Sequence, residues 1–305
     1  SVALGQWKTD QARIFRCVDS YMWEVDLEKS DLDGMTAYKI VLVNEANRSQ
    51  IHWEKGEDRL IPQVNGADTE KIVLVNVSSP RFDLPRWRGA GIVLPVFSLR
   101  SRTSFGTGDF GDLRKLIDWA YLCGLKAVQI LPINDTTRTG TWADSYPYNA
   151  ISVLALHPIY IDLNEWSDLP LFEKYREQGE KLNALPQLDY ERTFALKSAF
   201  LHELHALRGK EISASEAYSD FVRKNSSWLE PYVTFCNKRD KYGTADFRRW
   251  PPVKVSTEIE SDYYTFVQFL LFSQLSAVHK YATEKGVLLK GDIPIGVSRD
   301  SATAW

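Results

Sequence analysis

Aromatic residues are abundant in this sequence, and aromatic rings beside polar groups can bind sugars. The 305 residues include 10 Trp, 14 Tyr and 14 Phe. Sugars present flat C–H faces and many hydroxyls, so a stacking ring and a hydrogen-bonding side chain can together hold one. Rings also fill ordinary cores, and we expect most of these residues to do so. Near the N-terminus, Trp lies beside polar residues in Gly5–Trp7 and Ile51–Arg59, with Tyr38–Lys39 between them.

Two carboxylates lie at the ends of predicted strands. Asp135 comes shortly after the apolar segment 125–133, and Asp292 lies at the end of the segment 287–293. Enzymes built on parallel barrels place their chemistry at the carboxyl ends of the strands. We therefore expect both side chains to line a cleft there. A strand-end Asp that only caps a turn is the alternative for Asp292.

A third polar group lies in a single loop. Asp144, Ser145 and Tyr148 are separated by few residues, and Pro147 restricts the backbone between them. A stiff loop of this kind would suit a fixed sugar platform. It would suit a structural turn equally well, so both interpretations of Asp144 and Ser145 stay open.

The elements that carry these residues alternate between strand and helix. An apolar run at 91–97 has the pattern of a buried parallel strand, and 113–123 has helical periodicity with Gly124 at its C-terminal cap. Further buried strands follow at 125–133 and 287–293. This order predicts a parallel sheet or barrel.

The predicted sheet does not make a closed barrel. A TIM (β/α)8 barrel needs eight strand–helix units, and three strands are visible in 91–305. We therefore expect the first part of such a barrel, in a piece of a longer protein. Residues 169–245 are charged and helix-forming, and we expect them to form a peripheral helical insertion.

Residues 1–78 have a different pattern, that of short β-strands. Alternation of apolar and polar residues occurs at 21–27, 37–43 and 71–75, with polar turns between. This spacing predicts an all-β sandwich, and the abrupt start at Ser1 suggests that its first strand is missing. Trp23 is expected to be structural. Residues 79–90 are expected to form a linker, so the chain is multidomain.

One glycine-rich segment matches a nucleotide-binding pattern by its letters alone. Residues 106–111 fit G-x-G-x-x-G. They do not directly follow a strand, however, and no acidic residue ends the next strand at the expected distance. We expect this loop to lead into the following helix with Asp109 or Asp112 as N-cap, and we expect no nicotinamide cofactor.

Charge and cysteine content argue against several classes of protein. The net charge of −3 gives no electrostatic basis for binding nucleic acid or an anionic membrane. Three widely separated cysteines argue against a disulfide framework and predict a cytoplasmic protein. No His cluster has metal-ligand spacing, so we expect neither metal nor cofactor. The most apolar stretch, 263–278, is interrupted by polar residues and is shorter than the roughly 20 residues of a membrane span, so we expect a buried helix.

The N-terminal motifs, in their order, resemble a starch-binding module of carbohydrate-binding family 20. The resemblance implies that Trp7 stacks on a glucose ring and that Lys39 and Trp53 complete the site. Asp58 stands where the family often has Asn, and Asp can still accept a hydrogen bond from a sugar hydroxyl. Arg59 is expected to be structural. Packing of the two Trp rings in a core is the alternative.

The motifs of 91–305 resemble the first part of the catalytic domain of glycoside hydrolase family 77, the amylomaltases and disproportionating enzymes. They lie at 91–99, 104–112, 129–135, 144–152, 155–163 and 291–297. The form of residues 144–148 is similar to that of the subgroup with N-terminal starch-binding modules. The resemblance implies that Asp292 hydrogen-bonds near the cleaved sugar and that Tyr148 packs against the neighbouring sugar.

The resemblance also implies a reaction, which is transfer of α-1,4-glucan segments between maltodextrins or to other glycan acceptors. Retaining transfer uses a nucleophilic carboxylate and an acid/base carboxylate about 5–5.5 Å apart. In the family both come from later strands, so we expect them beyond Trp305 and assign no catalytic residue here. Maltodextrin, starch or another α-glucan is the expected partner. A non-catalytic glucan-binding protein and an α-amylase-like hydrolase stay open as alternatives.

Overall fold

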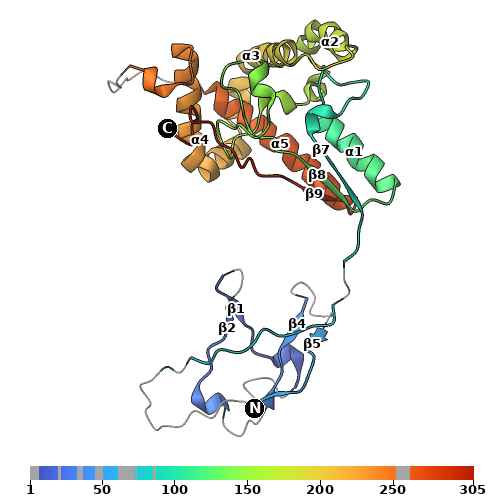
Figure 1. Cartoon of the computed structure of the whole chain (residues 1–305), viewed down its shortest axis with the longest axis vertical. Helices are drawn as coiled ribbons and strands as arrows, with labels where there is room; N and C mark the ends of the chain where they lie inside the picture. Colours follow the sequence, from blue (N-terminus) through green and yellow to red (C-terminus); the bar gives the residue numbers. More distant parts are fainter. Residues whose placement is uncertain are drawn as a thin grey trace. The chain divides into compact units, whose positions relative to one another are not determined.

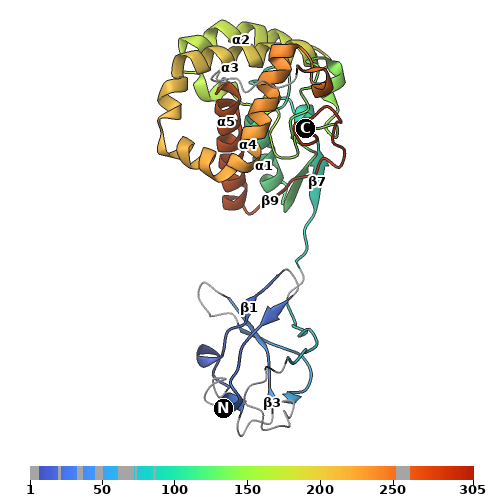
Figure 2. The same ribbon diagram turned by 90° about the vertical axis from the view of Figure 1, so that its left-hand side faces the viewer.

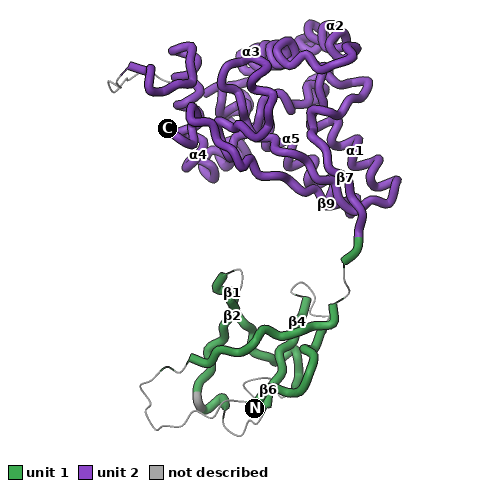
Figure 3. The backbone as a smooth tube through the Cα atoms, in the orientation of Figure 1, with its two compact units in different colours: residues 1–88 green, residues 89–305 purple. Residues whose placement is uncertain are grey.

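The chain folds into two compact units, residues 1–88 and 89–305 (Figure 3). The computed structural model describes residues 7–19, 22–32, 37–44, 51–60, 72, 74–84, 87–251 and 262–305. The unit boundary falls inside the segment that we expected to be a linker. Each unit is described here by itself.

Unit 1 contains short antiparallel strand pairs among its described residues. The pairs are β1 (Arg16–Cys17) with β2 (Trp23–Glu24), β3 (Ala37–Tyr38) with β6 (Arg59–Leu60), and β4 (Val41–Val43) with β5 (Ile51–Trp53). Two 3-10 turns, Thr9–Gln11 and Lys29–Leu32, also lie among these described residues. The strand pattern at 37–43 is thus split between β3 and β4. Of the strand predicted at 71–75, residues 71 and 73 lie outside the described residues and the others are in no strand. The β-sandwich stays a prediction.

Glu54 is the polar centre of unit 1. Its buried carboxylate accepts hydrogen bonds from the Ile40 amide at 2.7 Å and from Nε of Arg59 at 2.8 Å. Arg59 therefore has the structural role that we predicted for it. The prediction for Trp23 is wrong, because its side chain is 60% exposed on a two-stranded hairpin.

Unit 2 is built on a parallel sheet in the order β7 (Gly91–Leu94), β8 (Ala127–Ile130) and β9 (Leu288–Lys290). This confirms the three predicted strands and their parallel direction. The first two strands are shorter than their apolar runs, since Pro95 and Pro132 lack the amide that a longer ladder would need. At Gly91 a Cβ atom would lie 2.6 Å from the Ala127 carbonyl oxygen, so the close approach of β7 to β8 requires glycine.

Helix α1 (Phe110–Leu122) connects β7 to β8. Asp109 is its N-cap, and the carboxylate accepts from the amides of Gly111 at 3.1 Å and Asp112 at 3.2 Å. Gly124, with φ of +73°, follows its last turn as predicted. Helix α5 (Tyr263–Glu284) leads into β9 and is buried on its inner face, which confirms the buried helix expected at 263–278. Within the described ranges, no helix has the length and apolar character needed to cross a membrane.

Between β8 and α5 the chain forms α2 (Pro170–Asn183), α3 (Tyr190–Ser213) and α4 (Glu216–Tyr242). Both α3 and α4 pack along α5, as Figure 1 and Figure 2 show from two sides. Phe200, Leu201 and Leu204 of α3 are fully buried in the same core as Val128 of β8. The predicted insertion is therefore helical, but the expectation that it is peripheral is wrong. Short 3-10 turns lie at Val96–Ser98, Trp142–Ser145, Pro158–Tyr160, Leu163–Trp166 and Phe247–Arg249.

Candidate functional site: a sugar-binding cleft wall and an exposed tryptophan pair

Tyr148 and Asp292 meet beyond the carboxyl end of the sheet. The Tyr148 hydroxyl donates to Oδ2 of Asp292 at 2.8 Å, although the residues are 144 positions apart. This hydrogen bond raises the pKa of Tyr148 above its ordinary value. The segments also join at Ala150, whose carbonyl accepts from the Ser298 amide at 3.0 Å. The structure thus brings together the two side chains that we expected nearest the sugar.

Gly296 allows this approach of the two segments. A Cβ atom at this position would lie 2.6 Å from the Tyr148 carbonyl oxygen, which is far inside van der Waals contact. A larger residue at 296 would push the segment that follows Asp292 away from Tyr148. The glycine therefore allows the segment that follows Asp292 to lie close to Tyr148.

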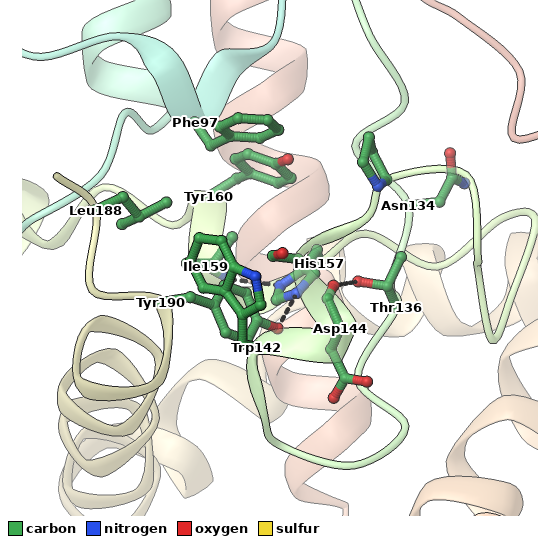
Figure 4. A pocket seen from close by; sticks show the side chains of 12 residues that line it. Phe97, Asn134, Thr136, Trp142, Asp144, His157, Ile159, Tyr160, Leu188 and Tyr190 are labelled. Carbon is green, nitrogen blue, oxygen red and sulfur yellow. Dashed lines mark hydrogen bonds between the residues drawn. The ribbon is translucent and has the colours of Figure 1, made fainter.

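The Asp144 carboxylate closes its own loop. It is buried and accepts from the amides of Thr139 at 2.8 Å and Gly140 at 2.6 Å, and from the Thr139 hydroxyl at 3.0 Å. The Thr136 hydroxyl donates to the Asp144 carbonyl (Figure 4). Since its oxygens already have protein donors, Asp144 shapes the loop that presents its neighbour Ser145.

Asp135 is also buried and satisfied from within the protein. Its carboxylate accepts from the Thr137 amide at 2.8 Å and from the Tyr232 hydroxyl of α4 at 2.6 Å. Gln268 of α5 donates to the same Tyr232 hydroxyl at 3.3 Å. Asp135 therefore ties the end of β8 to two helices, and Tyr232 lies too far along the sequence for this to have been foreseen.

A cavity of about 180 Å³ opens beside the loop that carries Asp144 and Ser145 (Figure 4). Its polar lining includes Asn134, Thr136 and Ser145, and its rings include Trp142 and Tyr190. Trp142 is 58% exposed, so one face of its indole can receive a ligand. A second, more open cavity of about 490 Å³ shares Trp142 and Tyr190 with the first.

His157 orients the Tyr190 hydroxyl in this cavity (Figure 4). Its Nδ1 accepts from the Ile159 amide at 3.0 Å, so Nε2 carries the hydrogen and donates to the Tyr190 hydroxyl at 2.9 Å. Burial lowers the pKa of His157, which keeps the ring neutral. The hydrogen of the Tyr190 hydroxyl is then directed to an acceptor other than His157.

Sequence reasoning missed Trp142, His157 and Tyr190. Trp142 stands two positions before Asp144 in the loop that had been singled out, so its exposure could have been suspected. Tyr190 begins α3, which was expected to lie away from the site. Only the packing of α3 against the core brings its first turn to the cavity.

The glycine-rich segment 106–111 is packed against protein. A Cβ atom at Gly108 would lie 2.0 Å from the Val96 carbonyl oxygen, and one at Gly111 would lie 2.1 Å from Oδ2 of Asp162. These glycines make room for neighbouring chain atoms, as expected of a loop that leads into a helix. Among the residues that the structure describes, no group of three or more His, Cys, Asp or Glu side chains could hold a metal.

In unit 1 the predicted glucan-binding residues lie close together. The rings of Trp7 and Trp53 have centroids 6.1 Å apart and are tilted by 31°, with the residues 57% and 42% exposed. Nζ of Lys39 donates to the Gly56 carbonyl at 2.7 Å and lies 3.7 Å from Oδ1 of Asp58. Rings so exposed are not part of a core, which removes that alternative.

Comparison with known proteins identifies the family. Residues 94–305 match the profile of glycoside hydrolase family 77, described as 4-alpha-glucanotransferase. The chain belongs to this family. A 4-alpha-glucanotransferase of Oryza sativa subsp. japonica is 33% identical over 99% of this chain and 33% of its own length. One of Chlamydia muridarum is 34% identical over 70% of this chain and 42% of its own length.

Two solved family 77 structures resemble the fold. An amylomaltase from Streptococcus agalactiae in complex with acarbose has a TM-score of 0.59 and 23% identity, over 72% of this chain and 46% of its own. The Corynebacterium glutamicum amylomaltase has a TM-score of 0.57 and 21% identity, over 71% of this chain and 32% of its own. The chain spans between 32% and 46% of the length of these four relatives. Its sheet and helices have the fold of that part of an amylomaltase.

Proposed function

We propose that the protein is a 4-alpha-glucanotransferase that moves α-1,4-glucan segments between maltodextrins, or to other glycan acceptors, by a retaining double displacement. The observation that carries this proposal is the contact of Tyr148 with Asp292 beyond the strand ends, in a chain of family 77. The cysteines at 17, 123 and 236 are free, which supports action in the cytoplasm. The nucleophile and the acid/base are not assigned to residues of this chain.

In this proposal the wall formed by Tyr148 and Asp292 holds the sugar next to the bond that is broken. The Tyr148 ring offers an apolar face to the C–H side of a glucose unit, while the carboxylate of Asp292 accepts from sugar hydroxyls. Its contact with Tyr148 fixes both side chains before the sugar arrives, which lowers the entropic cost of binding. Ser145, on the loop closed by Asp144 and anchored through Asp135, adds a hydroxyl.

The cavity beside Trp142 extends this wall for further glucose units. Its mixture of rings and hydroxyls suits a chain of sugars better than a flat aromatic or a charged ligand. The amylomaltase of similar fold from Streptococcus agalactiae was solved with acarbose. We therefore place several units of a maltodextrin between Tyr148 and Trp142.

Unit 1 is proposed to be a starch-binding module of carbohydrate-binding family 20. Two tilted, exposed rings 6.1 Å apart can stack on successive glucose units of a curved α-1,4-glucan. Lys39 donates to the carbonyls of Glu54 and Gly56 and lies near Asp58, and these contacts hold its ammonium in place. The module would keep the polysaccharide close to the cleft.

Calorimetric titration of this chain with maltoheptaose tests the proposal. We expect binding at two independent sites, one weakened in Trp53→Ala and the other weakened in Tyr148→Ala. Each ring contributes about 1–2 kcal/mol of apolar contact, so each affected site should weaken roughly tenfold. Cellohexaose, a β-1,4 chain of different curvature, should bind much less well.

Trp119→Ala is the matched control, because Trp119 is an exposed Trp on α1 that belongs to neither site. It should bind maltoheptaose as the parent does. Equal affinity for cellohexaose, or the same loss in Trp119→Ala, would show that exposed rings bind sugars without the sites proposed here.

A further inference from the structure

The loop 135–148 has internal hydrogen bonds that fix its shape. The hydrogen bonds of Asp144 and Thr136 run within the loop. Its position relative to the rest of unit 2 depends on contacts with other elements. That position determines where Trp142 and Ser145 face the proposed glucan.

Arg239 of α4 makes one of these anchors. Its side chain is only 12% exposed, and its three nitrogens all donate. One terminal nitrogen bonds the Thr137 carbonyl and, at 2.9 Å, the Thr137 hydroxyl. The other bonds the Tyr264 hydroxyl at 2.7 Å, and Nε bonds Oδ1 of Asp240 at 2.8 Å. The guanidinium therefore bonds groups of α4 and α5 and, at the same time, Thr137 of the loop.

The amide, the carbonyl and the hydroxyl of Thr137 all form hydrogen bonds within the protein. Its amide donates to Asp135, which accepts from Tyr232, about two turns before Arg239 on the same helix. Its carbonyl and hydroxyl accept from Arg239. Helix α4 thus controls Thr137 both directly and through Asp135.

The same helix also contacts the segment that follows Asp292. Phe235 of α4 packs against Trp305 with centroids 6.2 Å apart, and Nζ of Lys238 lies 4.6 Å above the Trp305 ring. Just after α4, Arg248 pairs with Asp300 at 3.3 Å. The loop that carries Tyr148 and the segment that follows Asp292 therefore both contact helix α4.

We propose that Arg239 is a positioning residue for glucan binding, which sets the loop 135–148 against the segment after Asp292 by holding Thr137. It touches no sugar itself. This inference rests on the proposed function for its consequence, since a displaced loop would carry Trp142 and Ser145 away from the glucan. The anchoring itself does not depend on which ligand binds.

Three variants on a Trp7→Ala/Trp53→Ala background, which isolates unit 2, test the proposal. Arg239→Met keeps the length of the side chain and removes its donors, and Arg239→Lys keeps the charge with a single donor group. Leu204→Ala is the control, because Leu204 is fully buried in the main core, which includes no residue of 135–148. Its cavity should lower the unfolding midpoint comparably without touching the loop.

Two readouts are measured. The affinity of unit 2 for maltoheptaose should fall about tenfold in Arg239→Met if the loop then occupies its binding-competent position only about a tenth of the time. It should fall less in Arg239→Lys and stay within twofold in Leu204→Ala. Hydrogen exchange of the Trp142 amide, which bonds the loop to Oε1 of Glu191 on α3 at 2.9 Å, should speed up by a similar factor in Arg239→Met and not in Leu204→Ala.

The outcomes separate the two proposals. If the background protein does not bind maltoheptaose, the glucan site fails, and hydrogen exchange alone still decides the anchoring. If Leu204→Ala matches Arg239→Met in affinity or in exchange, Arg239 contributes only stability and the positioning role is overturned. Unchanged affinity and exchange in Arg239→Met would overturn it as well.

Discussion

Asp109→Ala is expected to destabilise unit 2 by about 3–5 kcal/mol, because it strands the ammonium of Lys197 in the core. The Lys197 side chain is 0% exposed, and its Nζ bonds Oδ2 of Asp109 at 3.1 Å and the carbonyls of Ile159 at 2.9 Å and Ile161 at 2.7 Å. Removal of the carboxylate leaves two acceptors for three N–H donors. It also removes the N-cap of α1, which adds about 1 kcal/mol.

Asp109→Asn should behave very differently. Burial raises the pKa of Asp109 from 3.8 to about 7, although Lys197 acts in the opposite direction. Below that pH the native carboxyl is largely protonated, and an amide resembles it because both are neutral, have the same shape and present one carbonyl oxygen that accepts and one group that donates. At pH 5 we therefore expect Asp109→Asn to cost much less than Asp109→Ala.

The raised pKa also predicts how stability depends on pH. Between pH 4 and pH 7 the folded state keeps a proton that the unfolded state has lost, so this contribution is fully present below the unfolded pKa and is lost as pH rises through about 7. A shift of this size corresponds to roughly 4 kcal/mol. Asp109→Asn should lack this loss, so its stability should decline less steeply than that of the parent.

Urea unfolding followed by circular dichroism, at several values between pH 5 and pH 8, measures both effects. Equal destabilisation by Asn and Ala at pH 5 would refute the reasoning, since it would mean that Asp109 is ionised and needed as a charge. Parallel pH profiles for the parent and Asp109→Asn would refute it too.

Two further substitutions test the site. Trp142→Ala should weaken maltoheptaose binding to unit 2 about tenfold by calorimetry, because it removes the exposed ring of the cavity; unchanged affinity would remove Trp142 from the glucan path. Tyr232→Phe should lower the free energy of unfolding by about 1–3 kcal/mol, because it leaves the buried Asp135 short of a donor; a change below 0.5 kcal/mol, roughly the level of a surface substitution, would argue against that anchor.

Local signals in the sequence were sufficient for the strands of unit 2 and for α1. The apolar runs at 91–97 and 125–133, with a helical pattern between them, predicted two parallel strands. Gly124 marked the end of α1 and Asp109 was one of two candidates for its start, because an N-cap carboxylate and a left-handed glycine act on neighbouring residues. Such features depend on few positions, so they can be read without the fold.

The contacts that determine the roles of the carboxylates are not local. Asp135 was predicted to line the cleft and Asp144 either to bind sugar or to shape a turn, but their oxygens accept from Tyr232, Thr139 and other groups inside the protein. Tyr232 and Arg239 reach the loop from about 100 positions along the chain. The charged composition of 169–245 suggested an external insertion, because the buried face of α3 is diluted by polar residues of its exposed face.

The lengths of the products formed from maltotriose test the central claim most directly. The longest natural form of this protein, incubated with maltotriose and analysed by chromatography, should yield glucose together with a series of longer maltodextrins. Asp292→Ala should lower the rate of their formation strongly. Glucose as the main product without longer chains would indicate a hydrolase, and no conversion would indicate a binding protein; either result would contradict the account.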